Sequence, residues 1–180
     1  SHSVARKGIV RTFQNVRLFK TMTALENLLV AQHQHHKASV LAGLFNTASY
    51  RKQEQESIER AMHWLRYMGI AEFANREAGN LAYGDQRRLE IARCMITEPK
   101  LLMLDEPAAG LNPQEKKDLQ QLIGRLRDEY GVTILLIEHD MGLVMGVSER
   151  ILVMEYGRPI AVGLPEEIQN NEQVIKAYLG

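Results

Sequence analysis

Lys100-Leu101-Leu102-Met103-Leu104-Asp105-Glu106-Pro107 is the most informative segment of the chain. Its four consecutive apolar residues do not alternate with polar ones, which is typical of a strand buried on both faces of a parallel sheet. Asp105 and Glu106 follow where the strand is expected to end, and Pro107 cannot continue a sheet ladder. Ligands of open α/β sheets bind just beyond the carboxyl ends of the strands. Taken alone, the same residues also fit a core strand followed by a helix cap.

A second apolar run at 132–137 leads to Glu138 and His139. Asn112, Pro113 and Glu115, which lie between the two runs, predict a helix that begins with a capping box. A strand–helix–strand order predicts two parallel neighbours whose carboxyl ends meet at one crevice. Phosphoryl transfer needs a metal ligand, a carboxylate that positions water and a group that meets the γ-phosphate. Asp105, Glu106 and His139 would supply these three groups.

The remaining segments predict helices on either side of this unit. A capping box at Thr23 and Glu26 begins one helix, and a charged helix covers 51–68 and ends at Gly69. Its predicted buried face carries Ile58, Met62, Leu65 and Met68, and Trp64 is interpreted as a core residue. A further helix begins near Gly84, and its charged residues are expected to face solvent: Arg87, Arg88 and Glu90. Two β-like runs flank a turn at 157–158, and short helices are expected over 165–179.

Composition excludes several classes of protein. The chain has 180 residues, about one domain, and its 22 Lys and Arg balance 22 Asp and Glu without a basic stripe, so we expect no nucleic-acid partner. One cysteine excludes an intrachain disulfide framework. No apolar run approaches the roughly 20 residues of a membrane span, and we expect a soluble chain. His33, His35 and His36 lack further ligands at metal-site spacing, so we interpret them as a helix end or loop.

Five segments resemble, in order and spacing, the motifs of ABC-transporter ATPases over essentially the whole chain. Residues 101–106 resemble the Walker B strand, Leu81-Ala82-Tyr83-Gly84-Asp85 the signature motif, Gln14 the Q-loop, 109–112 the D-loop, and His139 the switch histidine. The resemblance implies an α/β fold: an ABC-type P-loop NTPase domain with an inserted helical subdomain, lacking its N-terminal strands and phosphate loop. Residues 1–14 are then the end of a core strand and the Q-loop, 15–95 the helical subdomain including the signature motif, and 96–180 the C-terminal part of the RecA-like core.

The resemblance also implies roles for the matching residues, with ATP and Mg²⁺ as cofactors. Asp105 would hold Mg²⁺ through its water shell, Glu106 would be the general base and His139 would contact the γ-phosphate. Gln14 would sense Mg²⁺ and link to the membrane subunits. The nucleotide of an opposite subunit would be contacted by a second set: Leu81, Ala82, Tyr83, Gly84, Asp85 and Asn112. The catalytic unit would be a head-to-tail dimer with two ATP molecules between the subunits.

Three departures from the family pattern affect these expectations. No Gly-x-x-x-x-Gly-Lys-Ser/Thr occurs in the sequence, so we expect this chain to be the downstream part of a longer ATPase and to be inactive as it stands. Ala82 replaces the usual signature Ser and removes one hydroxyl donor. Asp85 replaces the usual Gln, and its carboxylate either repels the triphosphate or points away toward Arg88.

Finer similarity points to one subgroup, the first ATP-binding subunit of the bacterial branched-chain amino-acid importer. The similar segments are 11–15, 26–31, 105–113, 137–141 and 177–180. Membership implies integral membrane permease subunits and a second ATP-binding subunit as partners, an indirect link to a solute-binding protein, and a peripheral place on the cytoplasmic face of the bacterial inner membrane. The lipopolysaccharide exporter's ATPase is the nearest alternative. A non-catalytic interaction module that docks through 14–55 is an alternative of another class, and DNA-repair ATPase heads would need coiled-coil insertions not found here.

Overall fold

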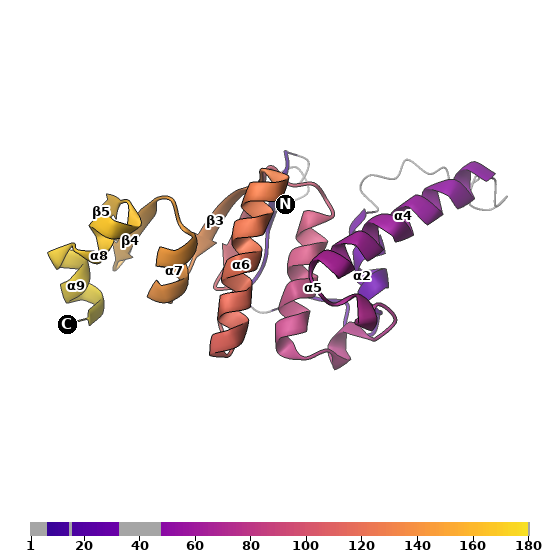
Figure 1. Ribbon diagram of the computed structural model, residues 1–180, viewed down its shortest axis with the longest axis horizontal. Coiled ribbons are helices and arrows are strands. Elements are labelled where there is room, and N and C mark those ends of the chain that lie inside the picture. Colours follow the sequence, from indigo (N-terminus) through magenta and orange to yellow (C-terminus); the bar gives the residue numbers. More distant parts are fainter. Residues whose placement is uncertain (1–6, 15, 33–47, 180) are drawn as a thin grey trace.

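The computed structural model describes residues 7–14, 16–32 and 48–179. The histidines at 33, 35 and 36 lie outside these ranges, as does much of the segment predicted as a loop after the first helix. Figure 1 shows the elongated arrangement of the described elements, with helices α2, α4 and α5 at one end and strands β4 and β5 at the other.

The centre of the structure is a parallel sheet in the order β1-β2-β3. Strand β1 (Ile9–Arg11) pairs with β2 (Leu101–Asp105), and β2 pairs with β3 (Thr133–Ile137), which places Asp105 opposite Ile137. Helix α6 (Pro113–Tyr130) connects β2 to β3, begins with the expected capping box at Asn112 and Glu115, and ends at Gly131 with φ of 63°. The prediction of two parallel neighbours joined by one capped helix is therefore confirmed.

Burial alternates along both strands. The predicted burial of β2 on both faces is only partly confirmed, because Leu101 and Met103 are partly buried, and the apolar run of β3 is buried on one face only. Leu102 and Leu104 of β2 are fully buried, but Leu135 and Ile137 of β3 are 46% and 48% exposed. Ile134 and Leu136 of β3 pack against the main core. The opposite face, with Leu135 and Ile137, has no comparable cover from the residues that the structure describes. A continuous apolar run is compatible with burial on both faces of the sheet. It does not show which segment of the protein covers the second face.

Helices α2 (Ala24–Gln32), α4 (Ala48–Tyr67) and α5 (Tyr83–Met95) pack beside the sheet, with short 3₁₀ segments η2 (Ala71–Phe73) and η3 (Ala78–Asn80) between α4 and α5. The capping box of α2 is confirmed, because Glu26 N–H donates to Thr23 Oγ1 and Thr23 N–H donates to Glu26 Oε2. One core cluster runs from these helices into the sheet and α6, and includes Leu28, Leu65 and Leu104. The helices and the sheet therefore share one hydrophobic core.

Two predictions about helix faces need correction. The buried face of α4 is rotated from the predicted stripe: Ala61, Trp64, Leu65 and Met68 are buried, whereas Ile58 and Met62 are only partly buried. On α5, Arg87 and Glu90 were expected in solvent, but both side chains are buried and paired with each other. The reason is that the segment after β1 crosses α5 and its backbone groups need hydrogen-bond partners there.

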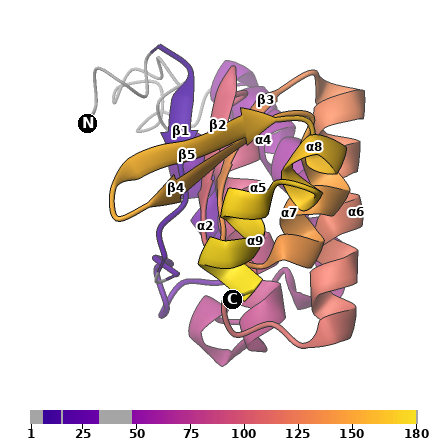
Figure 2. The same cartoon turned by 90° about the vertical axis from the view of Figure 1, so that its left-hand side faces the viewer.

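The C-terminal end forms a small second core. Helix α7 (Met141–Val147) leads to the antiparallel hairpin of β4 (Ile151–Glu155) and β5 (Arg158–Gly163), followed by α8 (Pro165–Gln169) and α9 (Glu172–Leu179). Ile151, Val153, Ile168 and Val174 bury one another, and Figure 2 shows the hairpin, α8 and α9 gathered at this end. The predicted hairpin and short helices are confirmed. Among the described residues, no helix combines the length and apolar character that crossing a membrane requires.

Candidate functional site

The carboxyl end of β2 carries the central carboxylate of the site. Glu106 adopts φ of 45°, a left-handed conformation that costs a non-glycine residue roughly 1–2 kcal/mol. Its N–H donates to Ile137 O at 2.9 Å, which ties the ends of β2 and β3 together. Its Oε2 accepts a hydrogen bond of 2.8 Å from Gln14 Nε2. The structure therefore brings together Gln14 and Glu106, two predicted site residues that are 92 positions apart in the sequence.

Asp105 has a cationic partner that sequence reasoning missed. Arg11 Nη2 lies 2.6 Å from Asp105 Oδ2, and the Asp105 N–H donates to the hydroxyl of buried Thr12 at 3.2 Å. The parallel pairing of β1 with β2 causes both contacts, because it sets Arg11 beside the end of β2. Arg11 is 94 positions from Asp105 in the sequence, so no pattern of neighbouring residues predicts that the two side chains pair. Only the pairing of the two strands reveals it.

The donor set at this edge fits Mg²⁺. Carboxylate oxygens from Asp105 and Glu106 and the amide oxygen of Gln14 are hard ligands, and Mg²⁺ commonly takes one or two carboxylates together with substrate phosphates. In the described part of the chain, no three His, Cys, Asp or Glu side chains cluster as a complete metal cage. The arrangement therefore suits a metal that arrives with a phosphate ligand.

Glu138 is not one of the predicted site residues, and it organises the loops that follow β2 and β3. Its side chain is only 1% exposed. Its Oε1 accepts from Ala108 N at 2.8 Å, and its Oε2 accepts from His139 N at 3.0 Å and Asp140 N at 3.3 Å. One buried carboxylate thus holds the loop after Glu106 against the backbone of His139. The imidazole of His139 is 72% exposed and can reach a ligand from the edge of the sheet.

The other side of the His139 loop is anchored by Asp140. This residue caps α7 by accepting from Leu143 N at 3.1 Å, and its Oδ2 lies 2.6 Å from Lys116 Nζ of α6. The hydrogen bond from Lys116 lowers the pKa of Asp140 below its usual value, and the bond from Leu143 acts in the same direction. The backbone on both sides of His139 is therefore fixed, whereas its ring projects into solvent.

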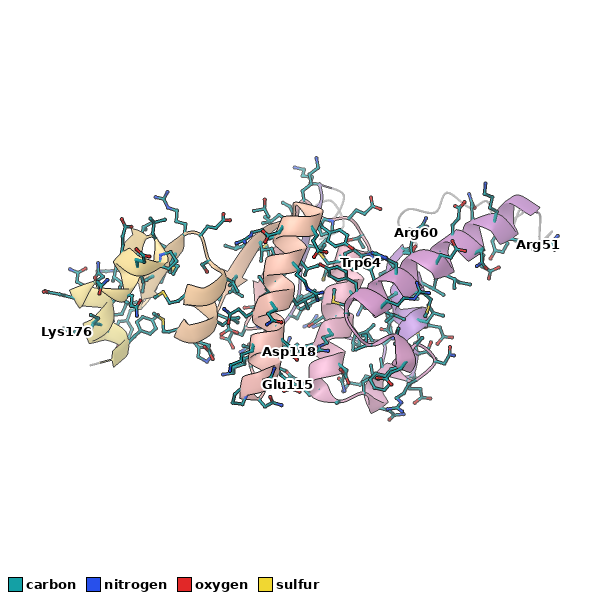
Figure 3. The ribbon with its side chains drawn as sticks, in the orientation of Figure 1. Arg51, Arg60, Trp64, Glu115, Asp118 and Lys176 are labelled. Atoms are coloured by element: carbon teal, nitrogen blue, oxygen red, sulfur yellow. The ribbon has the colours of Figure 1, made fainter. Side chains whose placement is uncertain are left out.

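A second group of predicted residues lies at the start of α5. Ala82 is the residue before the first turn of this helix and makes no side-chain cap, and Gly84 lies within that turn. A Cβ at Gly84 would lie 2.7 Å from Glu115 Oε1, and one at Gly110 would lie 3.1 Å from Tyr83 Cε1. The signature-like segment and the D-loop-like segment therefore pack closely together at the start of α6, whose lower end is marked by Glu115 in Figure 3.

The predicted site residues thus form two groups. The catalytic group comprises Gln14, Asp105, Glu106 and His139, and the signature group comprises residues 81–85 with Asn112. The side chain of Asn112 accepts from Gln114 N and Glu115 N as the cap of α6. Among the hydrogen bonds and ion pairs of the described residues, none joins a side chain of one group to a side chain of the other.

Helix α5 connects the two groups through its buried ion pair. Arg87 Nη1 donates to Phe13 O at 2.8 Å and to Glu90 Oε2 at 3.2 Å, and Arg87 Nη2 donates to Gln14 O. Glu90 Oε1 accepts from Phe13 N at 3.5 Å and Arg17 N at 3.2 Å. The helix that begins with the signature group therefore holds the backbone of Gln14, whose side chain contacts Glu106.

Asp85 lines a small cavity of about 40 Å³ between α5 and α6, together with Arg88 and Glu115. Burial raises its pKa above 3.8, and the nearby charge of Arg88 acts in the opposite direction. The guanidinium of Arg88 itself pairs with Asp118 at 3.0 Å. This position favours the expectation that Asp85 points toward Arg88 and α6.

Asp85→Asn is expected to stabilise the fold at pH 7. A carboxyl whose pKa is raised by folding prefers its protonated form, so its ionisation costs stability as the pH rises through the unfolded pKa, near 3.8, to the folded value. Thermal unfolding should give a higher midpoint for the variant at pH 7 and a difference that vanishes below about pH 4. Asp118→Asn, which removes the partner of Arg88, is the control and should not raise the midpoint. A lower midpoint for Asp85→Asn at pH 7 would contradict this assignment.

Comparison with known families and proteins agrees with this geometry. Residues 1–109 match the family model for ABC transporters, and residues 158–180 match the model for the branched-chain amino acid ATP-binding cassette transporter. The high-affinity branched-chain amino acid transport ATP-binding protein BraF of Pseudomonas aeruginosa is 64% identical over 179 residues, which are 99% of this chain and 70% of BraF. LivG of Escherichia coli K12, a transport ATP-binding protein with the same description, is 62% identical over 177 residues, 98% of this chain and 69% of LivG.

Solved structures show the same likeness. The ADP conformation of MJ1267, an ATP-binding cassette of an ABC transporter, superposes with a TM-score of 0.79 at 32% identity and covers 99% of this chain and 70% of MJ1267. The structure of cbiO1 from Clostridium perfringens, part of the ABC transporter complex cbiONQ, gives a TM-score of 0.78 at 27% identity, over 97% of this chain and 64% of cbiO1. The predicted fold class is confirmed.

Proposed function

This chain belongs to the ATP-binding family of ABC transporters, and we propose that it is the subunit that binds and hydrolyses ATP to energise the import of branched-chain amino acids. The observation that carries the proposal is the hydrogen bond between Gln14 and Glu106 at the carboxyl end of β2, beside Asp105. The names of BraF and LivG and the match of residues 158–180 support the branched-chain solute over the lipopolysaccharide exporter.

Apart from the phosphate loop, the residues at this edge can supply the groups that phosphoryl transfer needs. Bound Mg²⁺ would neutralise the charge of the β- and γ-phosphates. Asp105 would hold the metal, and Glu106 would accept a proton from the attacking water. Gln14 would keep the Glu106 carboxylate in place through their hydrogen bond, and the exposed ring of His139 would donate to the γ-phosphate.

The division of site residues into two groups supports a head-to-tail dimer. The signature group of one subunit would complete the catalytic group of the other, since a helix N-terminus with free N–H groups favours an anion. The second subunit is either a copy of this chain or a relative. Integral membrane permease subunits, and through them a solute-binding protein, would complete the importer on the cytoplasmic face of the bacterial inner membrane.

Residues 1–180 alone are expected to bind MgATP weakly and to hydrolyse it negligibly. P-loop enzymes hold the phosphates with a Gly-rich loop and its lysine, and no such motif occurs in this sequence. Titration with a fluorescent ATP analogue measures the affinity, and phosphate release measures the turnover. Micromolar affinity for a monodisperse monomer would show that other residues of this chain hold the phosphates.

The proposed function is tested by joining residues 1–180 to the phosphate-loop segment of a family member and expressing the product with importer membrane subunits. We expect the chain to co-purify with those subunits and to hydrolyse ATP. Recovery of a folded, ATP-hydrolysing protein that never associates with the membrane subunits would contradict the proposal.

A further inference from the structure

A cavity of about 400 Å³ lies at the end of the sheet opposite the catalytic group. Its apolar lining includes Trp64 of α4, Met95 at the end of α5, Pro99 just before β2 and Val132 just before β3. All four are buried, so they form the floor of the cavity. Figure 3 shows Trp64 on the part of α4 next to α6, and Arg60 farther along α4 toward Arg51. The proposed function uses none of these residues.

One wall of the cavity is a linked set of aromatic rings. The ring centroids of Trp64 and Tyr130 are 4.7 Å apart, and Tyr130 Oη lies 2.8 Å from His63 Nε2. These contacts join α4 to the end of α6. A wall of rings that already contact one another binds apolar groups at little entropic cost.

The rim of the cavity carries one positive and one negative side chain, Arg60 and Glu98. Arg60 Nε donates to Gln32 Oε1 at 2.9 Å, which orients the guanidinium. Glu98 adopts φ of 51° shortly after the end of α5, a left-handed conformation that glycine adopts without strain. A strained non-glycine residue is commonly found where a ligand site requires its side chain. The exposed carboxylate of Glu98 lies at the rim, where it can meet a positive group of a ligand.

We propose that this cavity binds a free branched-chain amino acid. The apolar floor and aromatic wall fit an aliphatic side chain, Arg60 fits the α-carboxylate, and Glu98 fits the α-ammonium group. The choice of a branched-chain amino acid rests on the proposed function, because the cavity chemistry by itself specifies a small zwitterion with an apolar body. Such a ligand contacts α4 and the amino ends of β2 and β3 together, so it would let the ATPase respond to the imported solute.

Fluorescence of Trp64 tests the proposal directly, because it is the only tryptophan in the chain. Titration of the full chain with L-leucine should give a saturable change with half-saturation at about 1 mM or below, which is within reach of a ligand of this size. Isocaproate lacks the ammonium group, isoamylamine lacks the carboxylate and glycine lacks the apolar body. Losing one charged contact should weaken binding about 10- to 100-fold.

Two variants of Glu98 separate a binding role from a structural one. Glu98→Gln keeps the size of the side chain and should weaken leucine binding about 10- to 100-fold, the same factor as removal of the ammonium group from the ligand in isocaproate. Glu98→Gly should also weaken binding while raising the thermal midpoint, because glycine adopts the left-handed conformation without strain. Glu59→Gln, an exposed carboxylate on α4 that bonds Gln55, is the matched control and should bind leucine normally.

The inference would be overturned if Trp64 fluorescence shows no saturable change up to about 10 mM L-leucine, a concentration about tenfold above the expected half-saturation. Wild-type affinity in Glu98→Gln would overturn it equally. Neither result bears on ATP hydrolysis or on association with membrane subunits, so failure here is distinguishable from failure of the proposed function.

Discussion

Replacing Glu106 with Gln is expected to abolish ATP turnover and to leave nucleotide binding intact once the chain is joined to a phosphate-loop segment. The amide keeps the size of the side chain and can still bond Gln14, so the geometry at the end of β2 should persist. The variant loses the ability to take a proton from water, and a general base contributes typically 10²–10⁴-fold. Phosphate release measures the first effect and fluorescent-ATP binding the second.

Glu155→Gln provides the control, because it changes an exposed carboxylate at the end of β4, away from the catalytic group. It should hydrolyse ATP at the wild-type rate. A loss of turnover of less than about tenfold in Glu106→Gln is smaller than the loss of a general base causes, and it would rule out Glu106 as the general base.

Arg87→Ala is expected to cause the largest loss of stability among single changes near the site. Arg87 and Glu90 are 3% and 5% exposed in their side chains and pair at 3.2 Å. Removing one partner of a buried pair typically costs about 3–5 kcal/mol, because the remaining charge stays buried and unpaired. The change also removes two donors to the backbone of Phe13 and Gln14. Urea unfolding measures the loss.

Arg88→Ala is the matched control for this prediction. Arg88 is the next residue on α5, but its ion pair with Asp118 is partly exposed, and such pairs contribute about 0–1 kcal/mol. If the two alanine variants unfold at the same urea concentration, the Arg87–Glu90 pair does not hold the segment after β1. In the joined chain, Arg87→Ala should also lower ATP turnover, because the Gln14 backbone loses its anchor.

Local sequence signals predicted most of the elements around the site. The capping residues of α2 and α6 and the apolar runs of β2 and β3 are local signals, because each depends only on residues a few positions apart in the sequence. The parallel pairing of β2 with β3 followed from one helix between two strands. For this reason the ends of these strands, and with them Asp105, Glu106 and His139, were placed at one edge.

The sequence did not predict contacts that depend on how distant segments cross. Arg87 and Glu90 occur in a charged helix, which predicts that they face solvent, because nothing in α5 shows that the backbone of Phe13 and Arg17 lies against it. The pairing of Arg11 with Asp105 likewise depends on β1 lying beside β2. An amphipathic pattern assigns charged residues to the solvent-exposed face of a helix. The burial of a charged residue can be recognised only once its partner from another segment is known.

The buried role of Glu138 had a partial signal. It lies between a strand and His139, in a run of three polar residues at the carboxyl end of β3. A carboxylate there can accept from the N–H groups of the following turn, as it does from His139 and Asp140. Its third bond, to Ala108, requires the neighbouring strand and could not be read from the local sequence.

The exposed face of β3 shows another limit of the apolar pattern. Leu135 and Ile137 are as apolar as the buried residues of β2, but the alternate residues Ile134 and Leu136 make the core contacts. A continuous apolar run is compatible with cover on both faces and does not identify the covering segment. The division of the chain at residues 14 and 95 also stays a prediction, since one core cluster crosses it.

Uptake of radiolabelled leucine tests the central proposal most directly. Bacterial cells that lack the corresponding ATP-binding subunit of their branched-chain amino-acid importer would receive residues 1–180 joined to the phosphate-loop segment of that subunit. We predict that this protein restores leucine uptake and that its Glu106→Gln variant, present at the same level in the membrane fraction, does not. Equal uptake with both proteins, or no uptake from a complex that assembles and hydrolyses ATP, would contradict the assignment to branched-chain amino-acid import.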